Sequence, residues 1–209
     1  MSRIPYPMVL VVLALISALA GPATSQDQMP VFGTTVVIPG GLRGQVYHLK
    51  RDTEALPRFE KLKSKGTVYT ASLNVPPQDF KIGFPGLTDR FEWFAIDYTG
   101  RFWVQSPGVY RFNLMSDDGS RLWIDDRPVI NNDGVHPPRQ MQGQVELAAG
   151  IHRIEVAYFQ GPRFVVALVL QVAPPGEDMR LFHVDQFKPP PGTEIPPEPS
   201  PAEPGKKRK

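Results

Sequence analysis

Two adjacent aspartates, Asp117 and Asp118, are the residues of this sequence best suited to bind a metal ion. Ca²⁺ prefers oxygen ligands and takes about six to eight of them. Neighbouring side chains of an extended strand point to opposite faces, so both carboxylates reach one ion only if the backbone between them is distorted. A bulge, a tight turn or a cis peptide would do this, and a third ligand must come from another loop.

The same run, Ser-Asp-Asp-Gly-Ser at 116–120, also has a plainer interpretation. Asp-Gly is a preferred turn pair because glycine tolerates positive φ, which predicts a hairpin whose acids are merely solvated. Spacing alone leaves both interpretations open.

Several other kinds of chemistry are excluded or disfavoured. The chain has no cysteine, which excludes disulfides, thiolate metal sites and a cysteine nucleophile. The four histidines are scattered without zinc-site spacing, and no serine lies in a Gly-x-Ser-x-Gly run. A glycosidase needs two carboxyls facing each other across a cleft, which nothing in the sequence indicates. We therefore expect no catalytic residue, and a hydrolase is the weakest hypothesis.

The net charge of +2 belongs to the ends of the chain. Residues 188–209 carry five basic and three acidic residues, and Arg3 adds one more charge, which leaves about −1 for residues 26–187. Phosphate binding needs a net basic face, so we expect no nucleic-acid partner.

Both termini differ in composition from the body. Arg3, an apolar run from Met8 to Ala20 and the small residues after it predict a signal peptide over residues 1–25. The run is short for a membrane span, which needs about 20 apolar residues, although an uncleaved anchor is the alternative. We expect a secreted or extracytoplasmic protein (periplasm or cell surface) without a membrane span after cleavage. Eight of the 24 prolines lie in residues 188–209, which predicts a disordered basic tail.

The body alternates apolar and polar residues over short stretches, as half-buried strands do. Such stretches are Val109–Leu114, Leu122–Ile124 and Gln144–Leu147, and the apolar run Phe164–Leu170 predicts a central strand. Frequent turn signals between them favour an all-β antiparallel sandwich. We expect a linker over 26–40, the sandwich over 41–175 and an edge strand or strap over 176–187. A helix is conceivable only within Thr53–Lys65, and Pro57 argues against it.

The run from Tyr110 to Ile130, YRFNLMSDDGSRLWIDDRPVI, resembles the signature of the PA14 (protective-antigen-like) domain family. Further blocks occur in the family's order, from an opening strand near Gly41 to closing strands that end near Val172. The resemblance implies a β-sandwich that recognises other molecules rather than catalysing a reaction.

In adhesin members of this family, an Asp-Asp pair joined by a cis peptide binds calcium, and the calcium binds sugar hydroxyls. Asp117 and Asp118 match that pair. The resemblance implies Gln160 and the Gly161 carbonyl as further calcium ligands, while Pro162 replaces the third carboxylate that some bacterial members have. The loop after the next hairpin supplies candidate ligand-binding residues: Asn131, Asn132, Asp133 and His136.

The sequence therefore predicts a secreted recognition module with calcium as cofactor and a carbohydrate or glycoconjugate as partner. The alternative is a structural or protein-interaction sandwich that binds neither metal nor sugar. Trp93, Trp103 and Trp123 could stack on sugars, but packing is the expected role of the latter two.

Overall fold

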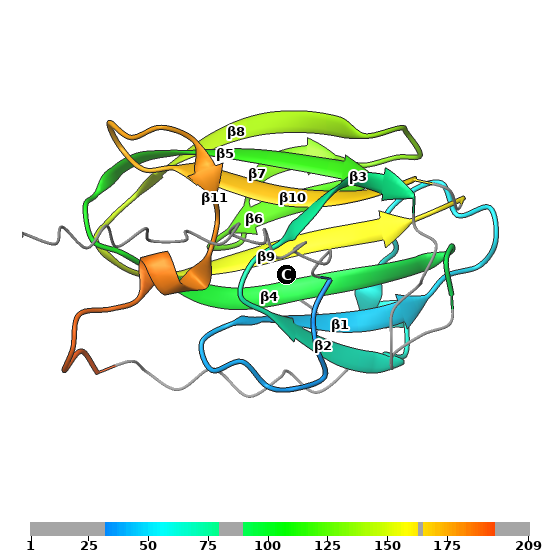
Figure 1. The fold of residues 1–209 in the computed structure, drawn as a ribbon, viewed down its shortest axis with the longest axis horizontal. Helices are drawn as coiled ribbons and strands as arrows, with labels where there is room; N and C mark the ends of the chain where they lie inside the picture. The colour runs from blue at the N-terminus through cyan, green and yellow to red at the C-terminus, as the bar shows by residue number, and fades with distance from the viewer. Residues whose placement is uncertain (1–31, 80–89, 163–164, 195–209) are drawn as a thin grey trace, which may run out of the picture.

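The structure, a computed structural model, describes residues 32–79, 90–162 and 165–194. They form two antiparallel β-sheets that face each other (Figure 1), which confirms the predicted all-β sandwich. The predicted signal peptide and most of the proline-rich tail lie outside the described residues. No helix among the described residues is long and apolar enough to cross a membrane.

The strands follow the alternating stretches of the sequence. The first six are β1 Leu42–His48, β2 Gly66–Thr70, β3 Asn74–Asp79, β4 Phe94–Val104, β5 Gly108–Asp117 and β6 Ser120–Ile124. The others are β7 Arg127–Asn132, β8 Arg139–Leu147, β9 Gly150–Gln160, β10 Val165–Ala173 and β11 Arg180–Leu181.

One sheet has the order β2-β1-β4-β9-β6-β7, and the other has the order β11-β10-β5-β8, with β3 also paired to β10. Every second residue of a strand points between the sheets, so Phe112 and Leu114 of β5 meet Val156 and Tyr158 of β9 in the core, and all four are fully buried. As predicted from its apolar run, β10 is a central strand, between β5 on one side and β3 and β11 on the other.

Of the two interpretations left open for the run at 116–120, the hairpin at Asp118-Gly119 is wrong. β5 belongs to one sheet and β6 to the other, so residues 118–119 form a corner at which the chain crosses between sheets. The hairpin lies one strand later, where β6 pairs with β7 around Asp125 and Asp126. Both residues have positive φ (50° and 63°), the conformation that a two-residue hairpin turn requires.

The segments before β1 and after β10 complete the core. Phe32 is buried and accepts a hydrogen bond from the Tyr98 hydroxyl, so part of the expected linker packs into the sandwich. At the other end of the chain, Phe182 and Phe187 pack against Phe102, with the 3₁₀ helix Val184–Phe187 following β11. Residues 176–187 thus combine the edge strand and the strap that were expected as alternatives.

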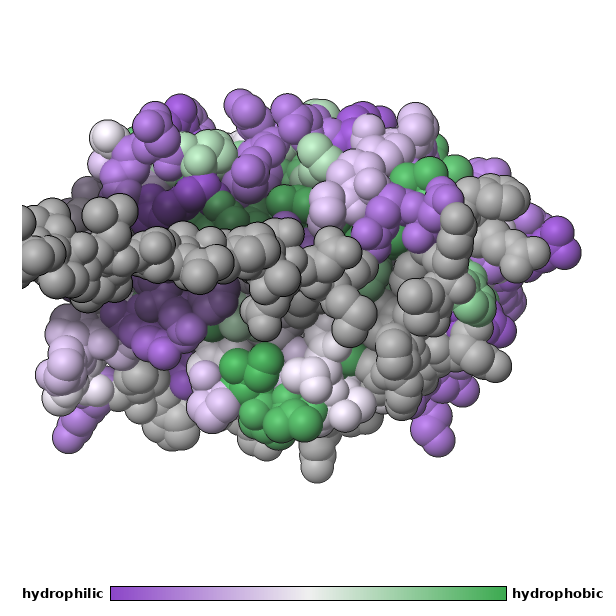
Figure 2. Space-filling view, in the orientation of Figure 1, coloured by the Kyte–Doolittle hydropathy of each residue, from purple (hydrophilic) through white to green (hydrophobic). Residues whose placement is uncertain are grey.

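The segment between β1 and β2 does not contain the helix considered for Thr53–Lys65, apart from the single 3₁₀ turn Phe59–Lys61. This segment, cyan in Figure 1, extends past the sheets at the end where β9 also finishes. The surface in Figure 2 is mainly hydrophilic, with small apolar patches. Loops at one end of a sandwich are the usual place for binding residues, because the rigid sheets fix their positions.

Candidate functional site

The Asp117–Asp118 pair sits at the corner between β5 and β6, and the peptide bond that joins the two residues is cis. The backbone distortion that the sequence analysis required is therefore present. The residues are only 7% and 3% exposed, respectively. Carboxylates are rarely buried this deeply without a partner.

Asp118 is held by two loops. Its Oδ1 accepts a hydrogen bond from the backbone N–H of His136 at 3.1 Å, in the loop between β7 and β8. Its Oδ2 accepts one from the N–H of Gly161 at 2.6 Å, in the segment after β9. Each carboxylate oxygen has two lone pairs, and Oδ2 also lies 3.5 Å from the Gln160 Nε2, so Oδ1 is the oxygen that keeps capacity for a further contact.

The electrostatics of the pair disfavour two negative charges. Burial and the neighbouring charge of Asp118 raise the pKa of Asp117 to about 6. Burial also raises the pKa of Asp118, although the hydrogen bonds from Gly161 and His136 oppose this shift. A cation bound between the carboxylates would remove both the repulsion and part of the desolvation cost.

Position 119 requires glycine because neighbouring atoms leave no room for a side chain, and not because its backbone has a positive φ. A Cβ atom at this position would lie 2.4 Å from Cε1 of Phe159 and 2.9 Å from Oδ1 of Asp133. Only glycine lets the corner pass between these two groups. The glycine of the Asp-Asp-Gly run is thus explained by the crossing of the chain between sheets.

Gln160 lies beside the pair, but its amide is already engaged. Its Nε2 donates to the carbonyls of Pro162 and Val165, both at 3.1 Å, and is 3.5 Å from Asp118 Oδ2. Its oxygen faces the hydroxyl of Tyr158 at 2.6 Å. The Gly161 carbonyl, the other expected ligand, accepts from the N–H of Trp93 at 3.2 Å. In this arrangement both residues orient the site, and neither turns its oxygen to the carboxylates.

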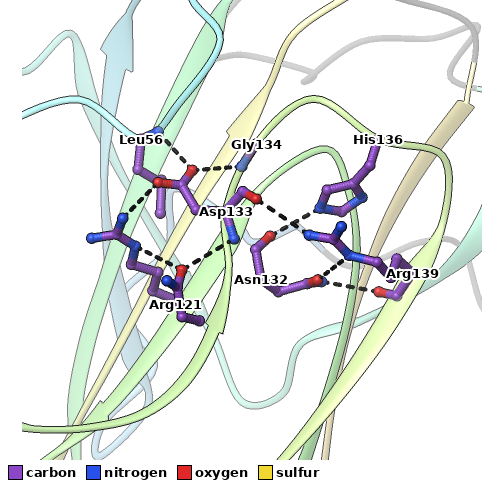
Figure 3. Close-up of polar contacts among 8 residues, drawn as sticks. Leu56, Arg121, Asn132, Asp133, Gly134, His136 and Arg139 are labelled. Carbon is purple, nitrogen blue, oxygen red and sulfur yellow. Dashed lines mark hydrogen bonds and ion pairs between the residues drawn. The ribbon is translucent and has the colours of Figure 1, made fainter.

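Asp133 joins three segments at this end of the molecule (Figure 3). Its Oδ1 accepts from the backbone N–H groups of Leu56 and Gly134, both at 2.8 Å, and its Oδ2 pairs with Arg121 at 2.8 Å. The segment between β1 and β2 is thereby fixed to the loop that carries His136. Both oxygens of the Asp133 carboxylate thus have partners within the protein.

The remaining candidates of this loop also make mainly structural contacts. Asn131 accepts from Arg121 at 3.1 Å, and the buried Asn132 bonds to Arg139 and to Ser116. His136 places its two ring nitrogens 2.9 Å from the carbonyl oxygens of Asn132 and Pro137. Of the loop, the His136 backbone is the part that touches the aspartate pair.

The fold thus brings Asp117, Asp118, Gln160, Gly161 and His136 together at one corner. Within the described residues, no three His, Cys, Asp or Glu side chains gather in a group that could hold a metal. Any bound cation would therefore depend on the two aspartates and on oxygens of other kinds.

A protein-family model matches the part of the chain that contains this corner. The PA14 domain model matches residues 60–181. The chain belongs to the PA14 domain family. The match begins after β1 and ends with β11, and it contains the whole corner. Among curated proteins, none matches the chain significantly.

Solved structures share the fold. The PA14 sugar-binding domain from an RTX adhesin superposes with a TM-score of 0.58 at 18% identity, covering 70% of this chain and 96% of that one. The epithelial adhesin 9 A domain from Candida glabrata, in complex with Galb1-3GlcNAc, has a TM-score of 0.50 at 13% identity, with 74% and 92% covered. An anti-sigma factor domain-containing protein has a TM-score of 0.56 at 21% identity. This PA14 chain matches only 50% of the length of that protein.

Sequence reasoning missed three contributors to the site. Trp93 was considered a sugar-stacking residue, but it is 9% exposed and packs with Leu49, Ala95 and Phe159. The phenol of Tyr158 bonds to the Asp117 carbonyl at 2.8 Å, and Leu56 reaches Asp133 from 77 residues away. No local pattern signals contacts between segments so distant in sequence. The Tyr158 contact could have been suspected, because a buried phenol needs a hydrogen-bond partner.

Proposed function

We propose that this protein is a secreted, non-enzymatic PA14 module that binds carbohydrate through a calcium ion held by Asp117 and Asp118. The supporting observation is the aspartate pair: two neighbouring carboxylates, almost fully buried and joined by a cis peptide, with the pKa of Asp117 raised to about 6. Such a pair is costly when ionised and suits a divalent cation.

The donor set fits calcium better than a softer metal. The pair offers hard carboxylate oxygens, whereas zinc sites normally use histidine or cysteine as well. Calcium takes about six to eight oxygens, so water and sugar hydroxyls would complete the shell beyond the two aspartates. Bound calcium would supply a charge that attracts and orients sugar hydroxyls. Gln160 and Gly161, which we considered as ligands through their oxygens, would here hold Asp118 in place through the Gln160 Nε2 and the Gly161 N–H.

Recognition of carbohydrate is favoured by the neighbours whose names state it, the RTX adhesin domain and the epithelial adhesin in complex with Galb1-3GlcNAc. The loop from Asn131 to His136 lies against Asp118 and would border a bound sugar. Binding rather than hydrolysis is supported by the position of the acids, because a glycosidase pair faces across a cleft and this pair is adjacent in sequence. Secretion follows from the predicted signal peptide.

Titration of calcium into the purified mature chain tests the metal site. Isothermal titration calorimetry should show one calcium per chain for the wild type and none for Asp118→Asn. Asp126→Asn is the matched control, because it removes the same charge from the exposed hairpin between β6 and β7. A wild type that takes up no calcium at millimolar concentration would contradict the proposal.

A glycan array then tests recognition, with calcium and with a chelator. Binding that disappears with the chelator and in Asp118→Asn is the expected result. The second candidate function, a structural or protein-interaction sandwich, is favoured by the backbone N–H groups of two separate segments that bond to Asp118. It predicts equal melting temperatures with calcium and with the chelator.

A further inference from the structure

A hollow in the surface lies at the same end of the sandwich as the aspartate pair. It has a volume of about 590 Å³ and is open to solvent. The residues that line it are Leu49, Lys50, Arg51, Arg90, Phe91, Glu92 and Trp93. Three of the side chains are cationic and one is anionic, so the hollow has a net positive charge.

The floor of this basic hollow is fixed by hydrogen bonds. The N–H of Leu49 donates to the carbonyl of Trp93 at 2.8 Å. One guanidinium nitrogen of Arg90 donates to the carbonyls of Leu49 and Trp93, at 3.2 and 3.3 Å. The Arg90 guanidinium is therefore held by the backbone beneath it, so that less conformational entropy is lost when an anion binds.

The hollow and the aspartate pair are neighbours. A Cβ atom on Gly161 would lie 3.0 Å from Oδ2 of Asp118 and 3.5 Å from Cζ3 of Trp93. Gly161 therefore lies between the Asp118 carboxylate and the indole of Trp93, one of the residues that line the hollow. Trp93 itself adopts a left-handed backbone conformation, with a φ of 58°, and donates its N–H to the Gly161 carbonyl.

The charge around the hollow also differs from that of the body as a whole. Residues 49–65 carry six basic and three acidic residues, whereas residues 26–187 together have a net charge of about −1. Through its Leu56 N–H, this basic segment is fixed to Asp133 and so to the loop beside Asp118. The segment next to the candidate site thus carries a net positive charge, and its exposed Arg51 lies 4.0 Å from the acidic Asp52.

We propose that the basic hollow is a second subsite, which binds an acidic group of the glycan whose hydroxyls meet the Asp117–Asp118 site. The group is a sulfate ester or a carboxylate, since both accept charge-assisted hydrogen bonds from Arg and Lys. The inference rests on the proposed function for the sugar itself, and it assigns the substrate class: acidic rather than neutral glycans.

The test uses a glycan array that holds Galb1-4GlcNAc beside its sulfated and sialylated forms, probed with the full chain in calcium and in a chelator. The wild type should bind one of the acidic forms about fivefold more tightly than the neutral sugar, as expected for a few partly exposed ion pairs. The sulfated and sialylated arms distinguish sulfate from carboxylate. The preference should shrink as salt rises, because salt screens exposed charges.

The decisive variant is Lys50→Gln/Arg51→Gln, which should bind acidic and neutral forms equally while its affinity for the neutral sugar stays at the wild-type value. The charge-matched control is Arg58→Gln/Lys63→Gln, on the same segment but outside the hollow, which should keep the preference. Equal binding of acidic and neutral sugars by the wild type, or no binding of any, overturns the proposal. Loss of the preference in the control variant overturns it as well.

The outcomes also separate this inference from the calcium site. Acidic glycans that bind in the chelator and to Asp118→Asn, but not to Lys50→Gln/Arg51→Gln, would support the subsite and contradict calcium-dependent recognition. If neutral glycans bind only with calcium and acidic glycans bind no more tightly, calcium-dependent recognition is supported and the basic subsite is contradicted.

Discussion

The chain contains the Asp-Asp sequence twice, once at each end of β6. Asp117–Asp118 precedes the strand and is buried at the corner between the sheets, with a cis peptide bond. Asp125–Asp126 follows it, and both of these residues have positive φ in the hairpin turn. The same dipeptide therefore occupies two different backbone conformations eight residues apart.

The surroundings of the two pairs differ in charge. Asp125 bonds to the His152 ring at 2.6 Å and lies 3.8 Å from Arg127, while Asp126 pairs with Arg153 at 3.0 Å. At the hairpin, the guanidinium groups of Arg127 and Arg153 lie beside the two acids. At the corner, Asp118 receives backbone N–H groups and the pKa of Asp117 rises to about 6. The comparison teaches that environment, and not the acidic pair itself, decides where an external cation would be favoured.

The largest effect is expected for calcium binding. At a calcium concentration of 100 times Kd, binding adds about 2.7 kcal/mol to the free energy of unfolding, which raises Tm by roughly 5–10 °C. Asp118→Asn should lose this rise, with an affinity at least about a hundredfold lower, whereas Asp126→Asn should retain it. Differential scanning fluorimetry with calcium and with a chelator measures the shift. A rise that survives in Asp118→Asn, or disappears in Asp126→Asn, would refute the distinction between the pairs.

The pH dependence of stability without calcium is the next largest effect. The pKa of Asp117, about 6, exceeds its ordinary value of 3.8, so the folded state binds more protons than the unfolded state between these values. The free energy of unfolding should therefore fall as pH rises from about 4 to 6, by up to about 3 kcal/mol, and stay low above pH 6. Urea titrations in a chelator measure it.

Two variants check the cause of this slope. Asp117→Asn should remove most of it, leaving the smaller part that comes from the raised pKa of Asp118, and saturating calcium should flatten it in the wild type. Asp126→Asn should leave it unchanged. A slope that persists in Asp117→Asn would assign the titration to another group.

Much of the sandwich could be predicted because its signals are local. Alternation in Val109–Leu114 and the apolar run that becomes β10 depend only on which face each side chain takes. The cis peptide at Asp117–Asp118 was one of three expected distortions, since two adjacent carboxylates cannot share a point on a flat strand. The corner was mistaken for a hairpin because Asp-Gly suits a turn equally well.

The rest of the site depends on contacts between distant segments. Gln160 and Gly161 were placed beside the pair by resemblance, but the direction of their oxygens follows from Tyr158 and Trp93. The hairpin acids Asp125 and Asp126 show the same limit, since their pairing with His152 and Arg153 depends on strand register. The sequence indicates which acidic residues can bind a cation. The fold decides whether a basic side chain of the protein already lies beside them.

At the hairpin end, His152→Ala should destabilise the fold without affecting calcium. The ring bonds to Asp125 and to the Ala148 carbonyl and lies beside Phe102, so its removal leaves two acceptors and a gap. A loss of about 2 kcal/mol is expected in urea unfolding, against less than about 0.5 kcal/mol for the exposed Asp126→Asn. Calcium affinity in calorimetry should equal that of the wild type. A weakened affinity would show that the two ends are coupled, contrary to the comparison.

The smallest effect on stability is expected at Asp133. Like the hairpin acids, it is paired with a basic side chain of the protein, but it lies at the same end of the sandwich as the corner. Its side chain is 11% exposed, compared with 61% for Asp126, so its ion pair with Arg121 is less screened. Asp133→Asn should cost about 1 kcal/mol in urea unfolding, because the ion pair is lost while one oxygen remains for Leu56 and Gly134. Asp126→Asn again serves as the control.

Hydrogen exchange locates this loss. The Leu56 amide and its neighbours should exchange faster in Asp133→Asn, since their attachment to the loop beside Asp118 is weakened. Exchange in the hairpin between β6 and β7 should stay at the wild-type rate. If the Leu56 region keeps its protection, the segment between β1 and β2 is held by the apolar packing of Leu56 and Phe59 instead. The Asp133 carboxylate would then be no more necessary to the corner end of the sandwich than Asp126 is to the hairpin end.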